Sequence, residues 1–200
     1  MTSFLSLSRV IDSINTFMGK STMWLILAIT LISAGNAIVR KAFDMSSNGL
    51  LEIQWYLFAA VFMLGAGYGL LKDSHVRIDF ISNRLTSRTR NWVDLLGIVF
   101  VLFPFCILMI VLSWPVFMSA YNNGEMSQNA GGLIRWPAYL LVPVGFALLM
   151  MQGVSELIKR IAFLRGLIED PIGEEASKSD DQKHMKELEK VAAARLAGEK

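Results

Sequence analysis

The chain has 200 residues, of which 54% are hydrophobic, and it carries a formal net charge of +2. Its apolar residues gather in four long blocks and not in the amphipathic stripes of soluble helices, which excludes a soluble globular domain. The pattern predicts an all-α membrane protein with four transmembrane helices. The single cysteine, Cys106, excludes an intrachain disulfide.

Residues 1–21 are expected to form an N-terminal amphipathic segment. Its apolar residues recur every three or four positions and are Leu7, Val10, Ile11, Ile14, Phe17 and Met18. This spacing favours an interfacial amphipathic helix on the inner membrane surface. The alternative is a cytosolic extension of the first span. A signal peptide would have a shorter apolar region that ends at small residues, so we expect no cleavage.

The first span is predicted at about residues 22–39, with Asn36 near its outer end. A buried amide costs free energy unless it finds partners, so Asn36 is expected to face protein, unless it already reaches the head groups. The loop that follows is short and makes the second span an antiparallel neighbour. Arg40 and Glu52 therefore emerge at the same depth, where they either form a structural ion pair or are solvated separately.

The second span is predicted at about residues 51–71. No charged side chain occurs between Ile53 and Leu71, and at ~1.5 Å per residue this stretch crosses a ~30 Å hydrocarbon core. Gly65 and Gly69 lie four positions apart, so one face of this helix lacks bulk. Such a face allows another helix to approach closely.

The third and fourth spans are predicted at about residues 92–114 and 138–158. Pro104 should kink the third span and free a carbonyl, which neighbours or a local irregularity must satisfy. The span is expected to end before Pro115. The loop at residues 116–135 either contacts a partner or is a plain solvated turn.

Charge bias predicts the orientation of the domain at residues 22–160. Ten Lys and Arg residues lie close to the spans on the side of the termini, against three on the opposite side, which places both termini in the cytoplasm. Residues 161–200 then form a charged cytoplasmic tail, with a short helix possible at 181–196. His75 lies in the basic connection between the second and third spans, and without a nearby Cys or second His it predicts no metal site.

The sequence lacks the patterns of catalysis. It contains no phosphate-cradling glycine loop, no nucleophile with a plausible base and no inward-facing pair of acids within the spans. Haem ligation is excluded because His75 and His184 both lie outside the spans. We therefore expect no enzyme, no cofactor and no nucleic-acid partner, which leaves a scaffold, a transporter component or a small channel in contact with membrane lipids.

Several residues together support a resemblance to a known family. They are Asn36 and Arg40 at the end of the first span, Glu52 and Gly65 in the second, and the His-x-x-x-Asp pattern of His75 and Asp79. Over residues 30–160 the chain resembles the small membrane subunit of tripartite ATP-independent periplasmic (TRAP) transporters. The strings LEIQWYLF, HVRIDF and GGLIRWPAYLLVPVGFALLMMQGVSE resemble the mannitol/chloroaromatic-type branch, many of whose binding proteins are thought to handle 2-oxo or hydroxy monocarboxylates. Ile134 departs from relatives, which often have an extra proline there.

The resemblance implies a subunit of the bacterial inner membrane that scaffolds a large permease. That permease would carry the solute and the coupling sodium, and a periplasmic solute-binding protein would deliver an organic acid to it. The small subunit itself would bind neither solute nor ATP, so the residues of the pattern, together with Gly69, are structural or interface candidates. The alternative from another class is a stand-alone oligomeric four-span channel or carrier.

Overall fold

The computed structural model describes residues 2–44, 47–72 and 86–168. Its elements are α1 (Thr2–Phe43), α2 (Asn48–Leu71), α4 (Ser87–Gly97), the π-helix η1 (Ile98–Leu102), α5 (Phe103–Asn122) and α6 (Trp136–Leu164). In the described residues, four helical stretches are long and apolar enough to cross a membrane: Phe4–Phe43, Asn48–Leu71, Ser87–Asn122 and Trp136–Leu164. The predicted class, an all-α membrane protein with four spans, is confirmed.

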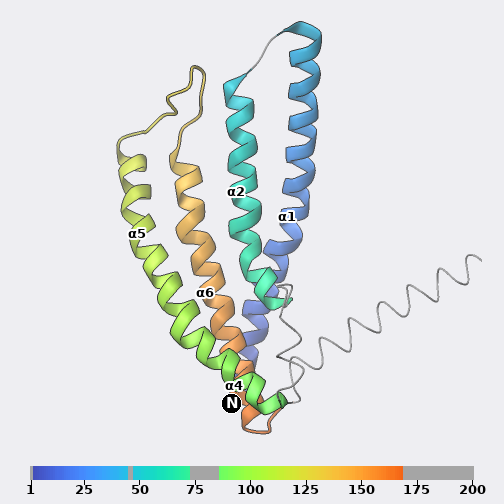
Figure 1. Ribbon diagram of the computed structural model, residues 1–200, viewed down its shortest axis with the longest axis vertical. Helices are drawn as coiled ribbons and strands as arrows, with labels where there is room; N and C mark the ends of the chain where they lie inside the picture. Colours follow the sequence, from blue (N-terminus) through green and yellow to red (C-terminus); the bar gives the residue numbers. More distant parts are fainter. Residues whose placement is uncertain (1, 45–46, 73–85, 169–200) are drawn as a thin grey trace, which may run out of the picture.

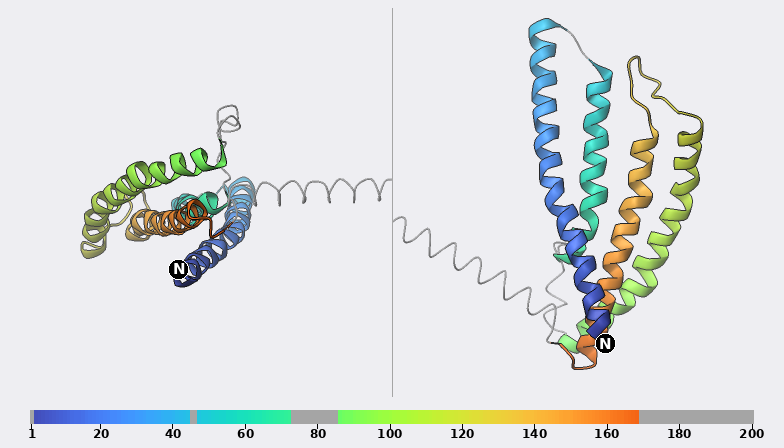
Figure 2. Two further views of the ribbon diagram at one scale, coloured as in Figure 1. Left: turned by 90° about the horizontal axis from the view of Figure 1, so that it is seen from below. Right: turned by 180° about the vertical axis from the view of Figure 1, so that it is seen from behind.

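The four long helices stand side by side in the order α1, α2, α6, α5 (Figure 1). Contacts join α1 to α2, α2 to α6 and α6 to α5, so that α2 and α6 form the centre of the row. We call the end where α1 begins and α6 ends the terminal end, and the opposite end the loop end. At the terminal end α1 also crosses to α6, and the view from below shows an open row of helices (Figure 2).

Helix α1 covers both the predicted amphipathic segment and the first predicted span. It runs without a break from Thr2 to Phe43, so no interruption marks the predicted boundary at residue 21. In hydrocarbon every backbone polar group must be satisfied within its own segment, which favours continuing a helix over interrupting it. The interfacial position of residues 1–21 stays a prediction.

The two prolines of the third span have different outcomes. Next to Pro104 the chain forms the π-helix η1, in which the Phe103 N–H bonds to the Ile98 carbonyl five residues earlier. This confirms the predicted local irregularity. The predicted end before Pro115 is wrong, because the helix continues to Asn122. A proline removes one hydrogen bond from a helix, whereas ending the helix leaves its last four carbonyls without intrahelical partners.

Helix α6 is longer at both ends than the predicted span, and glycines let it approach its neighbours closely. A Cβ at Gly145 would lie 2.6 Å from Met63 Cβ and 2.8 Å from the Met63 carbonyl oxygen of α2. A Cβ at Gly67 would overlap the Asn15 amide oxygen of α1. The crossing of α2 with α6 and α1 therefore requires bare backbone at these two positions.

The predicted bulk-free face of α2 lies partly within this chain. A Cβ at Gly65 would meet only Thr22 of α1, at 3.8 Å, which is an ordinary contact. Gly69 is half-buried in the same helix. His75 and Asp79 lie outside the described residues, as do His184, the possible helix at 181–196 and the tail from residue 169 onward.

Candidate functional site

The loop end is held together around Glu52, in the first turns of α2. Its carboxylate is only 5% exposed and accepts hydrogen bonds from three groups of the loop between α5 and α6. The donors are the Ser127 hydroxyl, the Asn129 amide at 2.8 Å and the Leu133 backbone N–H at 2.7 Å. We call Glu52 with these three residues the loop lock. The lock satisfies a buried charge with uncharged donors.

The loop at residues 123–135 is a folded hairpin whose residues are mostly exposed, and its contact with a partner stays a prediction. Met126 and Ile134 form an isolated antiparallel bridge, and the Asn48 amide donates to the Ala130 carbonyl at 3.0 Å. A Cβ at Gly132 would lie 2.9 Å from the Glu52 carboxylate, so only glycine fits there without a shift. The hairpin is thereby pinned onto the first turn of α2.

The base of the hairpin carries the ion pair of Arg135 with Glu125, at 2.7 Å. The Arg135 guanidinium also lies 5.5 Å from the ring centre of Tyr139. Its hydrogen bond to Glu125 raises the pKa of Arg135 above its ordinary value, so the guanidinium stays charged at any physiological pH. Both partners are more than a third exposed, and such pairs contribute little to stability.

The structure does not pair Arg40 with Glu52. Arg40 lines a cavity between the ends of α1 and α2, together with Asn36 and Leu51. The equal depth of Arg40 and Glu52 stays a prediction. The charge of Glu52 is met by the hairpin instead. Asn36 is 8% exposed and faces protein as predicted, but its amide oxygen has no hydrogen-bond partner among the described residues.

The terminal end contains a second polar cluster, which the prediction of no inward-facing acids missed. We call it the terminal network, and it consists of Ser8, Asp12 and Asn15 of α1 with Gln152, Ser155, Glu156 and Lys159 of α6. The ammonium of Lys159 lies 2.8 Å from Asp12 and 2.9 Å from Glu156. Asp12 also accepts from the Ser155 hydroxyl at 2.6 Å and from the Gln152 amide at 2.9 Å. One cation thus joins two acids from different helices.

A branch of this cluster reaches α4 through Arg160, which is 5% exposed. Its guanidinium lies 3.1 Å from Asp94 and 3.6 Å from Glu156, and it donates to the Asn91 amide oxygen at 3.3 Å. Each of these acids therefore has a cation beside it. Such pairing makes the buried charges structural, because an unpaired charge here would be costly.

The sequence contained a signal for the terminal network. Ser8, Asp12 and Asn15 recur at four- and three-residue spacing, as do Gln152 and Glu156 with Lys159. The amphipathic periodicity of the first segment is present, but most of its apolar residues are exposed, as is Phe17 at 67%, whereas Ile11 is buried. In a membrane the polar stripe seeks protein and the apolar stripe faces lipid.

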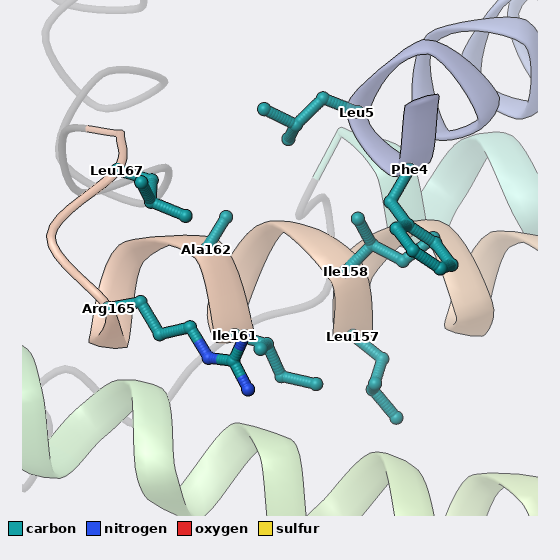
Figure 3. A pocket seen from close by; sticks show the side chains of 8 residues that line it. All are labelled: Phe4, Leu5, Leu157, Ile158, Ile161, Ala162, Arg165 and Leu167. Carbon is teal, nitrogen blue, oxygen red and sulfur yellow. The ribbon is translucent and has the colours of Figure 1, made fainter. Parts of the chain in front are cut away.

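Among the described residues, no group of three or more His, Cys, Asp or Glu side chains could hold a metal ion. A pocket of about 290 Å³ lies at the terminal end between the start of α1 and the end of α6. Figure 3 shows Phe4 of α1 beside Ile158 of α6, with Arg165 as the one charged lining residue. This lining suits an apolar chain better than a polar solute.

Comparisons with known proteins agree with this arrangement. The family described as "Tripartite ATP-independent periplasmic transporters, DctQ component" matches residues 15–163. A relative from Vibrio cholerae, named C4-dicarboxylate TRAP transporter small permease protein DctQ, is 28% identical over 173 residues, which is 74% of this chain and 72% of the relative. A protein of the same name from Pseudomonas aeruginosa is 30% identical over 137 residues, and the match covers 66% of this chain and 62% of that protein.

The family match begins within α1 and ends within α6, so it includes all four membrane-spanning helices and the hairpin that Glu52 holds. The chain therefore belongs to the DctQ family, the small permease components of TRAP transporters.

Proposed function

We propose that this small permease is a scaffold that joins a large permease in the inner membrane for ion-coupled uptake of an organic acid. The observation that carries the proposal is where the polar groups lie. The loop lock and the terminal network sit at opposite ends of the row, and their groups bond to one another within the chain. A solute path needs polar groups near the middle of the membrane that are available to the solute.

The open row of helices supports the same role. Helices α1 and α5 stand at its two edges, and large apolar side chains such as Trp24, Phe62 and Phe100 are exposed. Lipid or a partner helix has to cover these surfaces in the membrane. The large permease would cover part of them, and a periplasmic solute-binding protein would deliver the solute to the assembled pair. Asn36, Arg40, Glu52, Gly65, Gly69, His75 and Asp79 would serve structure or assembly and not solute binding.

The nature of the solute would be decided in the other polypeptides. Both curated relatives are named for C4-dicarboxylates. The sequence strings of this chain instead resemble the branch associated with 2-oxo or hydroxy monocarboxylates, and we propose such a monocarboxylate as the solute. The coupling sodium would bind in the large permease, and this subunit would need no cofactor.

The proposed orientation places both termini in the cytoplasm, as the charge bias favours. Single cysteines at Ser47, Ser87, Asn123 and Ser179 can be probed in intact cells with a membrane-impermeant thiol reagent. Cys106 is buried and gives little background. We expect labelling at positions 47 and 123 only. Labelling at 87 or 179 would contradict the orientation.

Reconstitution tests the function itself. Vesicles would contain this subunit alone, the large permease alone, or both. The solute-binding protein and the higher sodium concentration would be on the outside. The scaffold proposal expects solute uptake from the pair and none from this subunit alone. A stand-alone channel or carrier would instead give uptake from this subunit alone, which would refute the proposal.

A further inference from the structure

The cavity between α1 and α2 at the loop end has no role in the contacts described so far. Its volume is about 530 Å³, and most of the residues that line it are exposed. The last turns of α1 contribute Asn36, Arg40 and Lys41, the residue Asp44 follows them, and α2 contributes Leu51 and Gln54. Polar side chains from two helices and both signs of charge thus surround one space. We propose that this cavity binds the headgroup of a zwitterionic phospholipid that carries a primary ammonium, as in phosphatidylethanolamine.

Asn36 gives the cavity an unmet need for a ligand. More than nine-tenths of the side chain is buried, and its amide oxygen has no hydrogen-bond partner among the described residues. Buried polar side chains are normally satisfied, so an exception of this kind calls for an explanation. This oxygen is itself inaccessible to solvent, but Asn36 lines the cavity, so a half-turn of its amide would place the oxygen on the cavity side. A ligand that donates hydrogen bonds would satisfy it.

The charges around the cavity indicate the chemistry of the ligand. Arg40 and Lys41 place two cations in the last turn of α1, and both are exposed. A phosphodiester accepts hydrogen bonds from a guanidinium or an ammonium. Asp44 lies in the same lining and would repel a ligand that carried only negative charge. A ligand with a phosphate and an ammonium group would place one against the cations and the other between Asp44 and Asn36.

The position of the cavity favours a lipid over a soluble zwitterion. The nineteen residues from Ile53 to Leu71 carry no charge and span about 29 Å, close to the thickness of a hydrocarbon core. Leu51 and Gln54 stand at the outer end of that stretch, so the cavity opens at head-group level. Leu51, an exposed apolar residue of the lining, offers contact to the start of an acyl chain. A single carboxylate from a partner protein would leave Asp44 facing a like charge.

The test measures lipid binding to the purified full chain in detergent by native mass spectrometry. Phosphatidylethanolamine would be titrated against phosphatidylglycerol, which lacks the ammonium, and phosphatidylcholine, whose ammonium has no N–H donor. We expect one saturable molecule of phosphatidylethanolamine, bound on the order of tenfold more tightly than either analogue, since each loses a charge-assisted contact. Arg40→Gln should weaken this binding by a similar factor, and Asp44→Asn should remove the preference over phosphatidylglycerol. Lys72→Gln, at the opposite end of α2, is the matched control and should change nothing.

Equal binding of the three lipids would overturn the proposal, as would unchanged selectivity in both cavity variants. The variants alter exposed side chains, and their folding is checked by the reactivity of the buried Cys106. The same measurement on the complex with the large permease separates a lipid site from a protein contact. Loss of the bound lipid on complex formation, with crosslinks from position 40 to the permease, would assign the cavity to the partner. The binding assay on the isolated chain stands whether or not the scaffold proposal fails.

Discussion

The loop end and the terminal end are both held by buried polar groups, but the two ends use different bonds. At the loop end a single carboxylate, Glu52, is surrounded by uncharged donors of one hairpin. At the terminal end Lys159 of α6 joins Glu156 of the same helix to Asp12 of α1. The loop lock holds a local turn in place, whereas the terminal network joins the first helix to the last.

This difference predicts how much stability each end loses when one of its polar groups is removed. Removing a hydrogen-bond donor near Glu52 leaves other donors in place and costs a moderate amount of free energy. Removing Lys159 leaves two acids side by side and costs more, because Asp12 loses its counter-charge and Glu156 keeps only Arg160, at 3.6 Å. The terminal network should therefore control the stability of the whole row, and the loop lock should control the order of the hairpin.

The largest effect is expected for Lys159→Met, which leaves Asp12 and Glu156 without their shared cation. The free energy of unfolding should fall by about 3 kcal/mol or more, because breaking a buried pair on one side is strongly destabilising. This loss of stability can be measured by heating the protein and following how fast a thiol reagent reacts with the buried Cys106. Lys20→Met, at an exposed position of α1, is the control. A change no larger than that of the control would show that the network is not needed.

The next effect concerns the close contact between α2 and α6. Gly145→Ala places a methyl group 2.6 Å from Met63 Cβ and against backbone, so the helices have to separate, at a cost of about 1–3 kcal/mol. Gly35→Ala is a matched control in α1, where nothing lies within 4 Å of the added group. That substitution should be neutral or slightly stabilising. Equal effects at the two positions would argue against the close crossing.

Glu52→Ala is expected to act mainly on the hairpin. It leaves the Leu133 N–H and the Asn129 amide without their acceptor, at a cost of about 1–3 kcal/mol. Amide hydrogen exchange in residues 123–135 should become faster, while exchange within α1 stays slow. Glu125→Gln, which removes a partly exposed ion pair from the same hairpin, should cost only about 0–1 kcal/mol. Unchanged hydrogen exchange in the Glu52 variant would mean that the hairpin stays ordered without its hydrogen bonds to Glu52.

The smallest effect is expected for Arg40→Gln, because Arg40 forms no ion pair with Glu52. Stability should change by less than about 0.5 kcal/mol, as for most surface substitutions. Exchanging the two residues, Arg40→Glu with Glu52→Arg, should be as damaging as the Glu52 change alone. Recovery in the exchanged variant would indicate a direct pair that forms in the membrane.

The helices could be read from the sequence, whereas the pairing of polar groups could not. Long uncharged blocks fix where a chain crosses a membrane, and the second span was placed within three residues of α2. Charge near a helix end does not identify its partner. The sequence leaves Arg40 or water as the partner of Glu52, whereas its three actual partners lie more than 70 residues away in a loop without a distinctive pattern.

Glycines and prolines show the same limit. The spacing singles out Gly65 and Gly69, but close contacts occur at other glycines such as Gly67 and Gly145, because contact depends on how the helices cross. Pro115 is a helix breaker in water, and it is tolerated here where a broken helix would expose more unsatisfied carbonyls. The sequence pattern therefore predicts which segments are helices. The close contacts and the helix ends depend on the neighbouring helices and the membrane.

The central claim is that the polar residues of this subunit serve structure and assembly and not solute binding. The most direct test measures two quantities for Glu52→Gln: the yield of complex with the large permease, and the solute concentration that gives half-maximal uptake in reconstituted vesicles. We expect a lower yield of complex and an unchanged half-saturation concentration per assembled complex. A normal yield with a changed half-saturation concentration would contradict the claim.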